Sequence, residues 1–168
     1  MKKISLSFAA ALALFALGGC AEAKKQAECK SLIGAIGPHS TKIAKLADSM
    51  TDATPLDVGE KTFLAMSAES EAAAAEVKAL AVETPELKKF ADDYQTMCAA
   101  SSKAFKDMIA VAKKVDDAQK SAATNPQAAQ AELTKAQADA TAADAEMKKA
   151  VAPEDGIVDG INKACGAK

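Results

Sequence analysis

The chain has 168 residues, a formal net charge of −2, one histidine, one tyrosine and no tryptophan. It contains no arginine, which disfavours nucleic-acid binding because guanidinium groups are the usual ligands of phosphates and guanines. A single imidazole also excludes most catalysis based on histidine. Alanine fills about a quarter of the positions, and the shortage of β-branched and aromatic residues disfavours a sheet.

The first residues have the pattern of an export signal. Met1, Lys2 and Lys3 give a positively charged start, and residues 4–16 form an apolar run. This run is too short to cross about 30 Å of hydrocarbon as a helix, but it has the length of a secretory hydrophobic region. No later stretch approaches the ~20 apolar residues that a membrane-spanning helix needs.

The apolar run ends in Leu17-Gly18-Gly19-Cys20, which resembles the lipobox of bacterial lipoproteins. The resemblance implies that residues 1–19 are a signal peptide and that Cys20 becomes an N-terminus whose acyl chains hold the protein on a membrane. Ala21 stands where an aspartate would be the usual inner-membrane retention signal, so we expect the outer membrane. The alternative is ordinary cleavage after Ala23, which would release a soluble periplasmic protein.

Beyond a short tether at residues 20–26, we expect residues 27–168 to form one helical domain. A capping residue precedes a proline in Thr54-Pro55, Thr84-Pro85 and Asn125-Pro126. Proline suits the first position of a helix, because its missing N–H would have no partner there. These starts predict an all-α antiparallel bundle of about four helices, with a short closing helix beyond Pro153.

Each predicted helix carries apolar residues at helical spacing. Gly37-Pro38 interrupts the first of these stripes, but the spacing keeps its phase, which predicts a kink and not a break. Residues 127–145 are alanine-rich, so they are expected to form either a helix that buries little area or a partly detached arm. The expected core residues include Cys29, Leu32, Ile36, Ala47, Leu56, Phe63, Met66, Ala73, Val77, Leu87, Phe90, Tyr94, Met97, Cys98, Phe105, Ile109, Ala136, Ile157 and Ile161.

The histidine, the methionines and the acidic pairs could in principle bind a metal or a cofactor, but a structural role explains each of them. His39 follows the Gly37-Pro38 pair and is expected to be an exposed polar residue. The methionines fall on or beside the apolar stripes, which indicates core filling and not haem ligation. The acidic pairs lack the spacing of a calcium loop, so solvated helix faces are expected. We therefore expect no enzyme, no cofactor and no metal. The acidic pairs are Asp92-Asp93, Asp116-Asp117 and Glu154-Asp155.

The stretches Cys29–Ile33 and Ile161–Cys165 resemble small helical lipoproteins of Gram-negative bacteria, and this resemblance carries no activity with it. The expected function is that of a lipid-anchored, non-enzymatic cell-envelope protein that acts through protein contacts or envelope structure. The alternative is a helical binding module for an apolar ligand or for an unfolded client protein.

Three cysteines follow Cys20, and an oxidising compartment would pair two of them. Counting residues along antiparallel helices puts Cys165 about eight residues, or ~12 Å, from the level of Cys29. Cys98 lies about ten residues, or ~15 Å, away in the opposite direction. Because the turn near Pro153 can shift the last helix, we predict a Cys29–Cys165 disulfide and a buried Cys98 thiol. A Cys29–Cys98 bond is the alternative.

Overall fold

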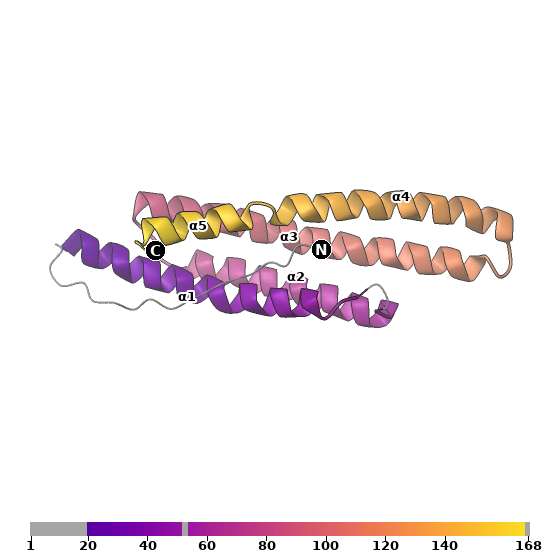
Figure 1. Ribbon diagram of the computed structural model, residues 1–168, viewed down its shortest axis with the longest axis horizontal. Coiled ribbons are helices and arrows are strands. Elements are labelled where there is room, and N and C mark those ends of the chain that lie inside the picture. The colour runs from indigo at the N-terminus through magenta and orange to yellow at the C-terminus, as the bar shows by residue number, and fades with distance from the viewer. Residues whose placement is uncertain (1–19, 52–53, 167–168) are drawn as a thin grey trace.

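The computed structural model describes residues 20–51 and 54–166, so the expected signal peptide at residues 1–19 lies outside the described residues. The described part folds into helices alone, in the order α1 (Cys20–Asp48), α2 (Leu56–Ala79), α3 (Pro85–Ser121), α4 (Pro126–Val151) and α5 (Glu154–Ala164). Successive long helices run antiparallel, and α4 and α5 return together along α3 (Figure 1). The expected all-α antiparallel bundle with a short closing helix is confirmed.

Two of the three expected helix starts are as predicted. Thr84 and Asn125 are the N-cap residues of α3 and α4, and a proline follows each. The Asn125 side chain accepts a hydrogen bond from the backbone N–H of Ala128 at 3.3 Å. Pro55, and not Thr54, is the N-cap residue of α2. The Thr54 hydroxyl instead accepts a hydrogen bond from the backbone N–H of Thr51 at 2.8 Å, which ties the turn before the helix.

Helix α1 passes through Gly37-Pro38 without a break, as expected. Pro38 has no N–H to donate to the carbonyl group one turn earlier, so the helical hydrogen-bond ladder is weakened at this point. Residues 20–26, expected to be a tether ahead of the bundle, are the first turns of α1. Lys24 forms an ion pair with Glu83, which connects these turns to the chain between α2 and α3.

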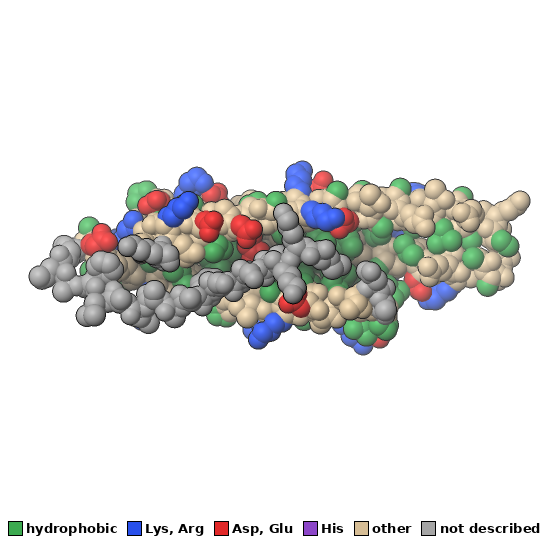
Figure 2. Space-filling view, in the orientation of Figure 1, with side chains coloured by type: hydrophobic (Ala, Val, Ile, Leu, Met, Phe, Trp, Pro, Cys, Tyr) green, Lys and Arg blue, Asp and Glu red, His purple; other side chains and the backbone are tan. Residues whose placement is uncertain are grey.

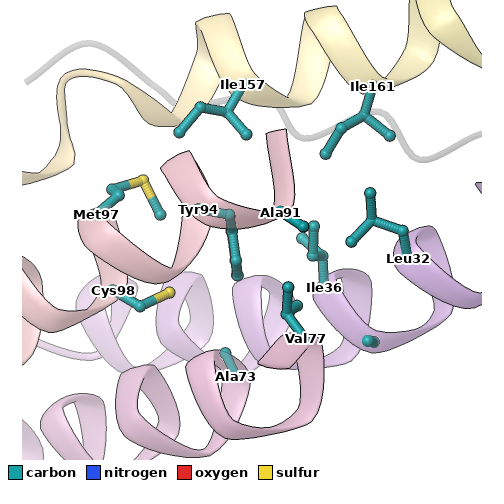
Figure 3. Close-up of a cluster of buried hydrophobic side chains, with 11 residues drawn as sticks. Leu32, Ile36, Ala73, Val77, Ala91, Tyr94, Met97, Cys98, Ile157 and Ile161 are labelled. Atoms are coloured by element: carbon teal, nitrogen blue, oxygen red, sulfur yellow. The ribbon is translucent and has the colours of Figure 1, made fainter. Parts of the chain in front are cut away.

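The core lies where α1, α2, α3 and α5 meet (Figure 3). Ile157 and Ile161 of α5 point from one side toward Tyr94 of α3, and Leu32 and Ile36 of α1 close the cluster. Most of the expected core residues are buried. Ala47 and Leu56 are exposed, because they lie beside the turn between α1 and α2, beyond the end of this cluster.

Helix α4 packs along α3 and has only Ala129 and Ala136 fully buried, so it is not the detached arm of the alternative prediction. The 37 residues of α3 compare with 24 in α2, and at the helical rise α3 is therefore about 20 Å longer. Helices α3 and α4 both continue past the turn between α1 and α2, where they form a two-helix hairpin (Figure 1). We call this part of α3 and α4, which the turn at residues 122–125 closes, the overhanging hairpin.

Candidate functional site

The expected attachment site for lipid lies at one end of the elongated molecule. Cys20 is the first residue of α1, and the end of α5 lies toward the same end of the molecule (Figure 1). The Glu28 carboxylate of α1 accepts hydrogen bonds from the backbone N–H groups of Glu83 and Thr84 at 3.1 and 3.0 Å. The Glu28 carboxylate thus serves as the acceptor for backbone N–H groups just before α3. The Thr84 side chain itself caps no N–H group of that helix. The start of α1 is therefore fixed to the rest of the bundle.

The predicted disulfide is present. Cys29 and Cys165 are bonded, with their Cα atoms 5.7 Å apart, and the bond joins the beginning of α1 to the end of α5. Cys98 is a free and buried cysteine, also as predicted. Burial raises the pKa of its thiol to about 11, against the opposing effect of a hydrogen bond with Tyr94. The thiolate needed for reaction is therefore scarce at neutral pH.

His39 is not the exposed residue that the sequence suggested. Its side chain retains 11% of its accessible surface, and it lies between two carboxylates of α2. Nδ1 is 2.7 Å from an oxygen of Glu69, and Nε2 is 2.9 Å from an oxygen of Glu76. The prediction was wrong because it considered the kink at Pro38 and not what the facing helix would offer.

The electrostatics of this cluster favour the protonated imidazole. Burial alone would lower the pKa of His39, but hydrogen bonds and attraction to Glu69 and Glu76 outweigh it, so the pKa lies above its usual 6.5. The hydrogen bond with His39 lowers the pKa of Glu69 below its usual 4.5, and Lys42 adds to this effect. We call His39, Glu69 and Glu76 the histidine cluster.

A second buried polar contact begins at Ser40, the residue that follows His39 in α1. The hydroxyl groups of Ser40 and Tyr94 are 3.4 Å apart, and Tyr94 has 1% of its surface exposed. Glu154, in the first turn of α5, is partly buried, and that burial raises the pKa of its carboxyl group above the usual value. A hydrogen bond from Ser40 partly offsets the shift. Polar contacts therefore link α1 to α3 and α5 in this region.

A groove with a volume of about 580 Å³ lies between α3 and the joint of α4 and α5. Its apolar part includes Met97, Ala104 and Ile157, and charged side chains, among them Lys103 and Glu146, stand at its rim. The rim charges have partners within the molecule, since Lys103 lies 2.5 Å from Asp107 and Lys149 lies 3.8 Å from Glu146. A molecule in the groove would therefore meet mainly apolar side chains and few unpaired charges.

The acidic pairs mostly lie on solvated helix faces, as expected. Asp92, Asp93 and Asp116 each form an ion pair with a lysine four residues away along α3. Glu154 is the exception, as described above. Red acidic and blue basic groups lie scattered among one another on the face of the bundle seen in Figure 2. Within residues 20–51 and 54–166 no cluster of three or more potential metal ligands occurs, and no helix has the length and apolarity to span a membrane.

Comparison of the chain with protein-family models, with curated proteins and with solved structures finds no match. Function must therefore be argued from the residues and their geometry. One cluster, formed by His39 with Glu69 and Glu76, was not predicted from the sequence. A signal for it was present, because the two glutamates are seven residues apart and so share one face of a helix.

Proposed function

We propose that the protein is a lipid-anchored, non-enzymatic protein of the bacterial cell envelope that acts through contacts with other envelope components. The observation that carries the proposal is that the lipobox cysteine, Cys20, is also the first residue of α1. An anchor at this position would attach to a helix that is fixed to the bundle by Glu28 and by the Cys29–Cys165 bond. The orientation of the whole molecule would then follow from its anchor.

The shape of the molecule supports a role in contacts at a distance from a membrane. The overhanging hairpin lies at the end opposite Cys20 (Figure 1). Helix α3 alone has 37 residues and so extends for about 55 Å. A protein anchored through Cys20 with its long axis upright would hold the turn at residues 122–125 about 55 Å from the lipid surface.

Replacement of the anchoring thiol tests the first part of the proposal. Cys20→Ser should abolish labelling with a palmitate analogue and move the protein from the membrane to the soluble fraction. Cys98→Ser is the matched control, because it removes a thiol outside the lipobox and should leave labelling unchanged. A Cys20→Ser protein that stays labelled and membrane-bound would contradict lipid anchoring.

The residue after Cys20 tests the expected membrane. Ala21→Asp introduces the usual inner-membrane retention signal and should shift the protein from outer-membrane to inner-membrane fractions on a density gradient. Ala21→Ser, which keeps a small uncharged residue, should leave the protein in the outer membrane. Recovery of the unaltered protein in inner-membrane fractions would refute the outer-membrane assignment.

Crosslinking in intact cells tests the role in contacts. A photoreactive side chain at Thr124, in the turn of the overhanging hairpin, should give a defined adduct with another envelope component. The same group at exposed Lys30, near the anchored end, serves as the positional control. If the two positions give the same adducts, or none, the overhanging hairpin is not the contact surface.

A second candidate function is that of a binding module for an apolar ligand. It is supported by the groove of about 580 Å³, a volume within the usual range of small-molecule sites. Ala100→Trp would fill this groove and should abolish binding of a fluorescent fatty acid, whereas Ala99→Trp places the same ring on the exposed neighbouring position. Equal binding by both variants, or none by the unaltered protein, would reject this candidate.

A further inference from the structure

We propose that the histidine cluster is a proton-dependent latch, which holds the second half of α1 against α2 while the imidazole carries two protons. Loss of one proton loosens the latch. This inference does not depend on lipid anchoring, because it concerns contacts within the described bundle. It assigns a regulatory role to the one histidine of the chain.

The hydrogen-bond geometry requires two donors on the ring. Nδ1 lies 2.7 Å from Oε2 of Glu69, and Nε2 lies 2.9 Å from Oε2 of Glu76. Both distances are those of hydrogen bonds. An ionised carboxylate only accepts, so each ring nitrogen must carry a proton. A neutral imidazole has one N–H, and its other nitrogen would then turn a lone pair toward a carboxylate oxygen. One attraction is replaced by a repulsion.

The surrounding charges keep Glu69 ionised, so the ring must still donate from both nitrogens. Both carboxylates come from α2, and on α1 the ammonium group of Lys42 lies 3.2 Å from Glu69. Lys42 keeps Glu69 ionised when the imidazole is neutral, so the glutamate does not become a donor in its place. From α3 and α5, Tyr94 and Glu154 interact with Ser40, the residue that follows His39. The raised pKa of His39 is due to the two glutamates.

The position of the cluster along α1 explains what the latch would release. His39 directly follows Pro38, where the helical hydrogen-bond ladder is weakened. Before this point, the Cys29–Cys165 bond and the fully buried Leu32 and Ile36 hold α1. After it, none of the apolar side chains of residues 41–48 is fully buried. Loosening the latch should therefore free the second half of α1 and leave the first half in place.

Nuclear magnetic resonance on the full-length chain tests the protonation requirement, because a single histidine gives one unambiguous ring signal. The pKa of His39 should lie above 6.5 and should fall in Glu69→Gln and in Glu76→Gln. Glu71→Gln is the matched control, because Glu71 lies on the same helix but pairs with Lys106 of α3. A pKa at or below 6.5, or an equal shift in the control, would overturn the proposal.

Amide hydrogen exchange tests the movement. After correction for intrinsic rates, protection of residues 41–48 should fall as the pH rises through the measured pKa of His39, while protection of residues 29–36 stays constant. His39→Gln should remove this pH dependence. Glu76→Gln, at a side chain that is about half exposed, should shift this pH dependence to lower pH. Protection that does not depend on pH, or that varies equally in His39→Gln, would show that no latch exists.

Discussion

Gly160 of α5 faces Phe90 of α3 so closely that a larger residue would have to displace the Phe90 ring. A Cβ atom at Gly160 would lie 2.3 Å from a carbon of the Phe90 ring. Relative to the same change at an open helical position, Gly160→Ala should therefore cost roughly 1–3 kcal/mol in urea unfolding, because the Phe90 ring must be displaced from its place beside the core.

Gly156 is the control for this substitution, because it lies on the same helix and a Cβ there meets no atom within 4 Å. Gly156→Ala should stabilise the protein by roughly 0.5–1 kcal/mol, the usual gain in an open helical position. Combining Gly160→Ala with Phe90→Leu should recover part of the lost stability. Equal effects of the two glycine substitutions would mean that α5 does not pack on Phe90 as described.

Phe105 has 2% of its surface exposed, and its ring stacks on that of Phe63 with centroids 6.2 Å apart. Phe105→Ala should cost roughly 3–5 kcal/mol, the range for a large side chain removed from a packed core. Phe90 is only half-buried, so Phe90→Ala should cost less. A Phe105→Ala effect below that of Phe90→Ala in urea unfolding would contradict the described packing of α2 on α3.

At the residue scale, the histidine cluster marks the limit of what could be predicted. The residue counting that predicted the disulfide used a turn near residue 54, and the same counting puts His39 level with Glu69. Propensity and spacing do not say which side chains turn toward each other, so a histidine beside a proline was interpreted as exposed. The structure was needed to show that Glu69 and Glu76 of α2 lie on either side of the His39 ring.

At the scale of the helices, the Cys29–Cys165 bond fixes α5 to α1, and its removal should be costly. The two cysteines are 136 residues apart in sequence, and on the chain-entropy model such a bond contributes about 5 kcal/mol. The double variant Cys29→Ser/Cys165→Ser should lose much of this free energy of unfolding. A reducing agent should destabilise the unaltered protein but not the double variant. Equal sensitivity of both proteins to the reductant would contradict this assignment.

The helices were predictable because the prolines that start them and the spacing of their apolar residues indicate the same elements. Prolines at Pro85 and Pro126 start α3 and α4 where expected, and the apolar spacing identifies most of the buried residues. The tether at residues 20–26 was not recognised as helix, because its charged residues show no apolar stripe. Lys24 and Glu28 instead bond with the chain between α2 and α3, and such contacts between distant segments cannot be read from spacing.

At the scale of the whole molecule, the histidine cluster should give stability a defined pH window. The folded-state pKa of Glu69 is lowered, so its contribution is present above about 4.5 and is lost as the pH falls through the lowered value. The folded-state pKa of His39 is raised, so its contribution is present below about 6.5 and is lost as the pH rises through the raised value. Unfolding free energies measured from pH 3 to 9 should therefore be highest between these limits.

The variants of the cluster provide the check on this window. His39→Gln should flatten the alkaline side of the curve, while Glu71→Gln should leave that side unchanged. An alkaline decline that persists in His39→Gln would have to come from another group, and the window would then not belong to the histidine cluster.

The bond between Cys29 and Cys165 has a consequence for cleavage of the backbone. It closes the polypeptide into a covalent ring that includes every turn between the helices, among them the exposed turn of the overhanging hairpin. A protease that cuts this ring once produces a nicked molecule in which both pieces stay joined. Such a molecule keeps its full mass in a denaturing gel and separates into two fragments only when a thiol is added.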